Sequence, residues 1–151
     1  KITDYIETLE NPILIEDIFS LRNRVIPSDI GDNVRFKSTY NLIMTLEKCF
    51  SPWKKLLTLQ TIGKEARQIV YDVLVNDYNQ EYVEESVDLS ISIFNVLLLL
   101  SKNKNIPIHL EFLNLFFADD TNSDENAIII ASIQSAYKLI LEGQSNILET
   151  E

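Results

Sequence analysis

The 151-residue sequence has few residues of the types that build covalent or metal-bound sites: one cysteine, one histidine and three glycines. A single cysteine excludes an internal disulfide, and one cysteine with one histidine cannot complete the usual structural zinc site. The glycines lie too far apart in sequence to form a phosphate-binding loop. Asn-x-Ser/Thr glycosylation sites are also absent. These absences predict an intracellular protein, cytoplasmic or nuclear, that uses no metal or cofactor.

Long hydrophobic runs are equally scarce. The longest apolar stretch covers residues 87–100 and is interrupted by Asp88 and Asn95. A membrane-spanning helix needs about 20 predominantly apolar residues, so this stretch predicts a buried helix, and we expect no membrane association. The chain begins at Lys1 and ends in polar residues, from which we expect a piece of a longer protein.

Basic residues are few in the last third of the chain. The formal net charge is −10, and residues 106–151 contain a single basic residue, Lys138. An acidic surface repels phosphate backbones, so we expect no direct binding of nucleic acid. A protein partner with a basic segment is the natural complement. The alternative is that the acidic residues only keep the surface soluble.

What the sequence does contain is apolar periodicity typical of helices, with polar caps at their ends. Ser51-Pro52 combines a capping side chain with proline at a first helical position. Gly63 predicts a corner between two helices, and Gly143 predicts a helix end. The likeliest long loop is 27–33. The predicted helices cover residues 12–25, 38–50, 52–62, 64–77, 86–101, 107–118 and 124–142, with a short turn at 3–9.

Two segments also carry a strand signal. Alternate residues from Val87 to Ile93 are apolar, and the three isoleucines at 128–130 are β-prone. The alternation dissolves into a continuous apolar run, and hairpin turns such as Asn-Gly are absent. We therefore favour an all-α fold.

An apolar segment, an acidic connector and a long apolar segment occur twice. Val73 corresponds to Phe116 and Phe94 to Tyr137, both at an offset of 43 residues. This period is in the range of armadillo and HEAT repeats. Residues 64–146 resemble such units, most clearly at Ile106-Pro107. The other positions that carry the resemblance are Leu113, Phe116, Phe117, Asp119, Asp120, Ala131, Ala136 and Leu139.

The resemblance implies an armadillo/HEAT-like solenoid segment or a compact multi-helix domain of about seven helices. We expect one α-helical domain over 1–151, with a possible leading part at 1–33 and a repeat-like part at 34–146. The function implied is non-catalytic protein–protein interaction, as a scaffold or regulatory domain. Alternatives are a Wapl-like cohesin-regulator helical domain, an oligomerisation module and a small-molecule-binding helical bundle.

The candidate partner-binding residues are mainly acidic. They would steer a basic or helical partner segment, whereas one basic cluster with an aromatic residue could contact an acidic partner or a phosphate; its alternative is a core tryptophan with a solvated rim. The candidates are Glu81, Glu84, Glu85, Asp119, Asp120, Asp124, Glu125, Trp53, Lys54 and Lys55.

No pattern in the sequence predicts catalysis or metal binding. His109 has no local nucleophile or carboxylate beside it, so we interpret it as a partly exposed structural histidine. Cys49 ends an apolar stripe and is interpreted as a buried, inert thiol. The acidic run from Asp120 resembles a calcium loop, but Glu125 stands where glycine is required and Ala131 where glutamate is required. We therefore expect an acidic connector between two helices.

Overall fold

A computed structural model describes residues 2–11, 26–27, 29–78, 87–117 and 124–150, and every element in these ranges is a helix. The elements are α1 (Ile2–Glu10), the 3-10 helix η1 (Ile30–Asp32), α3 (Val34–Asn41), the 3-10 helix η2 (Leu42–Lys48), α4 (Pro52–Asn76), α5 (Val87–Ser101), α6 (Ile106–Phe117) and α7 (Asp124–Thr150). The predicted all-α fold is confirmed as a compact multi-helix domain.

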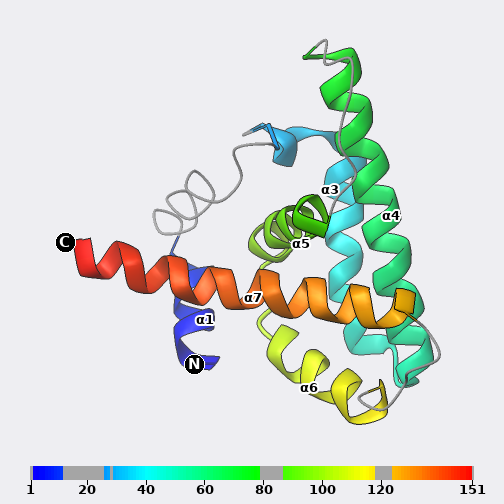
Figure 1. The fold of residues 1–151 in the computed structure, drawn as a ribbon, viewed down its shortest axis with the longest axis vertical. Helices are drawn as coiled ribbons and strands as arrows, with labels where there is room; N and C mark the ends of the chain where they lie inside the picture. Colours follow the sequence, from blue (N-terminus) through cyan, green and yellow to red (C-terminus); the bar gives the residue numbers. More distant parts are fainter. Residues whose placement is uncertain (1, 12–25, 28, 79–86, 118–123, 151) are drawn as a thin grey trace.

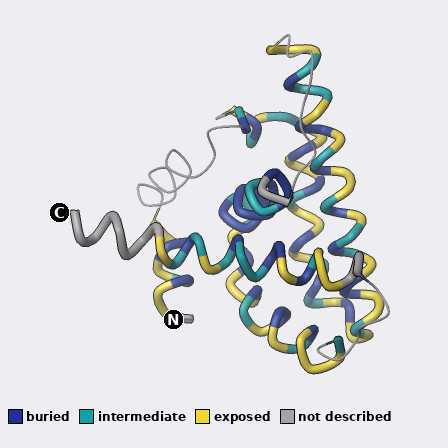
Figure 2. The backbone as a smooth tube through the Cα atoms, viewed as in Figure 1, coloured by how far each residue is buried: buried dark blue, intermediate teal, exposed yellow. Residues whose placement is uncertain are grey.

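The core is organised around α5. This helix packs against α7, α4 and α3, and Figure 1 shows it at the centre of the domain with α7 passing across it. The residues from Ile93 to Leu99 are all buried, which Figure 2 shows as dark blue. Asn95 lies within this run, and its Nδ2 donates a hydrogen bond to the Ala136 carbonyl of α7 at 3.1 Å. The predicted central, enclosed helix is therefore present, and the strand alternative is not.

Helix α4 is one continuous helix of 25 residues, so the corner predicted at Gly63 is wrong. Its start agrees with the sequence, because the Ser51 hydroxyl accepts a hydrogen bond from the Lys54 amide at 3.4 Å and Pro52 follows the cap. A Cβ added at Gly63 would lie 3.0 Å from Cζ of Phe94. This glycine therefore permits the close approach of α5, and it does not turn the chain.

Two other helix boundaries differ from prediction. The segment predicted as one helix at 38–50 is α3, which begins earlier because Asn33 caps it, followed by η2. The Asn33 side chain accepts from the Phe36 amide at 3.1 Å. Helix α7 continues through Gly143, the predicted end, to Thr150. A glycine inside a helix costs only about 1 kcal/mol, which the rest of so long a helix offsets.

The N-terminal helix α1 joins the same core. Tyr5 and Leu9 are buried, and the Tyr5 ring meets the Tyr137 ring of α7 edge-on, with centroids 4.9 Å apart. The helix predicted at 12–25 lies outside the described residues. The division of the domain into a leading part and a repeat-like part stays a prediction.

Candidate functional site

None of the seven acidic candidates has a side chain among those that the structure describes. Asp124 and Glu125 form the first turn of α7, but only their backbone is described. The other five, Glu81, Glu84, Glu85, Asp119 and Asp120, fall outside the described residues. Their role in partner binding stays a prediction.

The basic cluster is divided between the surface and the interior. Trp53 is 63% exposed, and its ring meets Phe117 of α6 edge-on at a centroid distance of 4.8 Å. Lys54 is exposed, whereas Lys55 is only 7% exposed. Adjacent residues on a helix point about 100° apart, so sequence neighbours separate into different environments.

Lys55 belongs to a buried polar network. Its Nζ donates to the Leu46 carbonyl at 2.7 Å and to Nδ1 of His109 at 3.1 Å. The ring proton is therefore on Nε2, which lies 3.2 Å from Oε1 of Glu47. Asn105 donates to the same carboxylate at 3.0 Å. We call Lys55, His109 and Glu47 the Lys55 network; it links η2, α4 and α6.

The pKa values of His109 and Glu47 are shifted within this network. Burial, together with the charge of Lys55, holds the pKa of His109 below its usual value, although Glu47 opposes this. Burial raises the pKa of Glu47, but hydrogen bonds from Asn105 and His109 outweigh it, so the net pKa is lowered. His109 is thus a buried, neutral structural residue, more enclosed than its sequence position suggested. Cys49 is buried, as expected.

A shallow surface depression lies between α5 and α7. It has a volume of about 120 Å³, and we call it the α5–α7 groove. Ile128 is 50% exposed here, and Ala131 beside it is also exposed. Apolar side chains are therefore exposed to solvent on this face of α7. The groove is lined by Ile91, Ile128, Ala131, Ser132 and Ser135.

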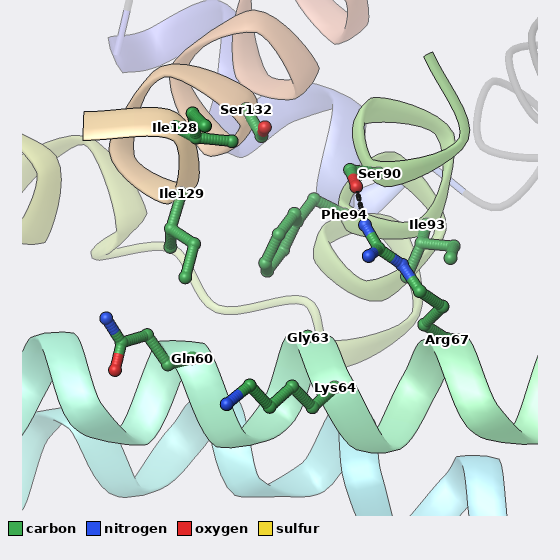
Figure 3. A pocket seen from close by; sticks show the side chains of 10 residues that line it. All are labelled: Gln60, Gly63, Lys64, Arg67, Ser90, Ile93, Phe94, Ile128, Ile129 and Ser132. Carbon is green, nitrogen blue, oxygen red and sulfur yellow. Dashed lines mark hydrogen bonds between the residues drawn. The ribbon is translucent and has the colours of Figure 1, made fainter. Parts of the chain in front are cut away.

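A deeper pocket adjoins the groove and shares Ile128 and Ser132 with it. Its volume is about 290 Å³, and we call it the α4–α5–α7 pocket. Figure 3 shows side chains from all three helices around it, with Arg67 donating a hydrogen bond to the Ser90 hydroxyl. The lining residues are Gln60, Gly63, Lys64, Arg67, Ser90, Ile93, Phe94, Ile128, Ile129 and Ser132.

The sequence analysis did not identify either the groove or the pocket. One signal was present: three consecutive isoleucines on a helix cannot all face the core, because successive residues are about 100° apart. In the structure Ile130 is buried, Ile129 is half-buried and Ile128 is exposed. An apolar triplet at the start of a helix could therefore have indicated an exposed apolar position.

Comparison with known protein families assigns most of the sequence to one family. The model of the vacuolar sorting protein 9 (VPS9) domain matches residues 36–145, which include all of α4, α5 and α6. The chain belongs to the VPS9 family. No match was found among curated proteins, and none among solved structures.

The VPS9 family overturns three predictions. The armadillo/HEAT assignment is wrong, because the family model that matches the chain is that of the VPS9 domain. The expectation of a non-catalytic scaffold without enzymatic activity is also wrong, because VPS9 domains are guanine-nucleotide exchange factors for Rab5-like GTPases and catalyse nucleotide exchange. The Wapl-like, oligomerisation and small-molecule-bundle alternatives have no support. The expected protein partner agrees with the family, whose domains bind Rab GTPases.

Within the described ranges, none of the helices combines the length and the hydropathy that crossing a bilayer requires. Across the same part of the chain, His, Cys, Asp and Glu side chains form no group of three or more that could hold a metal ion.

Proposed function

We propose that this VPS9 domain is a guanine-nucleotide exchange factor for a Rab5-like GTPase, and that the GTPase docks on the α5–α7 groove. The observation that carries the proposal is the family match over residues 36–145. The groove supports the docking part, because it exposes Ile128 and Ala131 beside the buried face of α7. We also propose that the chain acts in the cytoplasm, on endosomes, because other VPS9 proteins act there.

Exchange follows from differential affinity. A protein that binds the nucleotide-free GTPase more tightly than the GDP-bound form must weaken GDP binding by the same factor. An apolar docking surface contributes affinity, and contacts made only with the nucleotide-free form contribute the difference. The groove needs only to be rigid enough to favour one GTPase conformation, and its two helices are fixed by the buried core around α5.

The direct test is release of a fluorescent GDP analogue from a Rab5-like GTPase in excess GTP. We expect the chain to accelerate release, and Ile128→Asp to lower the catalytic efficiency by about tenfold or more, since a charge would be buried at the interface. Ile108→Asp is the matched control, because Ile108 is 57% exposed on α6 and lies outside the groove.

The two parts of the proposal can fail separately. If the chain accelerates none of the Rab5-like GTPases, the exchange activity is refuted. If wild type accelerates release and Ile128→Asp matches Ile108→Asp, exchange stands and docking on the groove is refuted.

The acidic connector offers a second contact for the GTPase. Asp124 and Glu125 start α7, four and three residues before Ile128, so their backbone lies at one end of the groove. We propose that they and the acidic residues before them attract a basic segment of the GTPase. Simultaneous charge reversal at Asp119, Asp120 and Asp124 should slow exchange at low salt and have less effect at high salt, where exposed charges are screened. Unchanged exchange at low salt would contradict this contact.

A further inference from the structure

The α4–α5–α7 pocket contains two buried polar atoms that have no hydrogen-bond partner. They are Nε of Arg67 and Oγ of Ser132, and Ser132 is only 2% exposed. Buried polar groups in native proteins are almost always hydrogen-bonded, so two orphans in one pocket indicate a missing partner. Arg67 is otherwise well anchored, because its Nη2 donates to Ser90.

The chemistry of the orphans defines the partner's polar end. A guanidinium N–H only donates, and a serine hydroxyl can donate as well. Each needs an acceptor, and a carboxylate gives the stronger, charge-assisted bond with arginine. Lys64, three residues before Arg67 on α4, also lines the pocket.

The walls define the rest of the ligand. Phe94 of α5 and Ile129 of α7 reach into the space between the helices in Figure 3, and Ile93 and Ile128 are also lining residues. Water alone would occupy about 290 Å³ with on the order of ten molecules at about 30 Å³ each. Most of these would touch apolar side chains, which the apolar body of a ligand would cover instead.

We infer that the α4–α5–α7 pocket binds a small amphipathic carboxylate, with its head group on Arg67 and Ser132 and its apolar body against Phe94 and Ile129. This is a ligand site on an exchange domain, and it differs from the free-standing ligand-binding bundle considered from the sequence. Ile128 and Ser132 line both the pocket and the groove. If the proposed docking function holds, the bound carboxylate therefore competes with the GTPase.

Binding is tested with octanoate as the probe, by NMR of the isoleucine methyl groups in the full chain. We expect saturable shifts at Ile93, Ile128 and Ile129, and none at Ile43, which is buried on η2 away from the pocket. Octanol, which has the same apolar body without the charge, should bind at least tenfold more weakly. Equal affinity for octanol, or octanoate shifts that do not saturate, would refute the carboxylate site.

Variants assign the head-group contacts. Arg67→Gln should weaken octanoate binding by about tenfold or more, because it removes a charge-assisted hydrogen bond. Arg35→Gln is the matched control: Arg35 is exposed and paired with Asp72, outside the pocket. Ser132→Ala removes only the hydroxyl and should weaken binding about threefold, so it carries the test if Arg67→Gln does not fold. Wild-type affinity in Ser132→Ala and in any folded Arg67→Gln protein refutes the inference.

The competition is measured separately from the binding. Octanoate should slow exchange by the wild-type chain and not by Arg67→Gln. Saturable methyl shifts without an effect on exchange would support the site and refute its coupling to docking. If the chain has no exchange activity, the NMR titration still decides the ligand site.

Discussion

Replacing Lys55 with methionine removes the centre of the Lys55 network and keeps most of the apolar stem. Two hydrogen bonds from Nζ are lost, at 2.7 Å to the Leu46 carbonyl and at 3.1 Å to His109. A hydrogen bond from a charged donor contributes about 1.5–3 kcal/mol. Nδ1 of His109 loses the donor it has in Lys55, whereas the Leu46 carbonyl keeps the Cys49 amide as a donor at 3.1 Å. Removing a buried charge recovers part of its desolvation. We therefore expect Lys55→Met to lower the free energy of unfolding by about 3 kcal/mol.

The assay is urea unfolding followed by circular dichroism, with thermal unfolding as a second measure. For a chain of this size a loss of about 3 kcal/mol lowers the melting temperature by about 6–12 °C. Lys54→Met is the matched control, because the neighbouring lysine is exposed and its replacement should change stability by no more than about 0.5 kcal/mol. Equal stabilities of the two variants would refute the reasoning.

A double-mutant cycle with His109→Phe separates the network from simple packing. Residues joined by a hydrogen bond show coupling energies of about 0.5 kcal/mol or more, whereas independent sites add. Additive losses for Lys55→Met and His109→Phe would mean that each residue stabilises the fold by packing alone.

Three other predictions concern the fold. Burial lowers the pKa of His109, so the neutral side chain contributes fully to stability above pH about 6.5, and this contribution is lost as the pH falls toward the folded-state pKa. The loss of stability, up to about 1.4 kcal/mol per pH unit, should vanish in His109→Gln. Gly63→Val should destabilise the protein by about 1–3 kcal/mol in urea unfolding, because the added side chain meets the ring of Phe94, and an unchanged midpoint would contradict this. Asn95→Ala should cost about 2 kcal/mol in the same assay, since it removes the donor to the Ala136 carbonyl and leaves a cavity, and a loss below about 0.5 kcal/mol would contradict it.

The sequence predicted the helices well where the signal is local. The Ser51-Pro52 cap and the apolar run at 87–100 are read from adjacent residues, and both predictions match the structure. The predictions that Gly63 and Gly143 end helices failed because glycine can also lie within a helix. Gly63 serves close packing against a helix distant in sequence, which no local pattern reveals. Gly143 lies within a long helix whose extent is set by more than one residue's propensity.

The site was harder to predict because it depends on which helices meet. Lys55 and His109 are 54 positions apart in sequence, and their hydrogen bond exists only because α4 and α6 pack together. Likewise, Arg67 and Ser132 line one pocket only through the packing of α4 and α7 around α5. The VPS9 family model spans residues 36–145 and so includes helices that are distant in sequence and packed together, whereas caps and periodicity each describe a single helix.

Helix α4 contributes to the Lys55 network and to the α4–α5–α7 pocket at different places along its length. Because the two are separated, the predictions for one can be tested independently of those for the other. Lys55 lies in the first turn of α4 and Arg67 is 12 residues later, about 18 Å along the axis at about 1.5 Å per residue. The Lys55 network fixes the start of α4 to η2 and α6. The pocket is lined by the middle of α4 together with α5 and α7, and the groove is lined by α5 and α7. Lys55→Met should therefore weaken the fold and leave exchange unchanged below the melting transition, while Ile128→Asp should lower the efficiency of exchange by about tenfold or more without loss of stability. Exchange that fell in parallel with stability in Lys55→Met would mean that the network also sets the geometry of the docking surface.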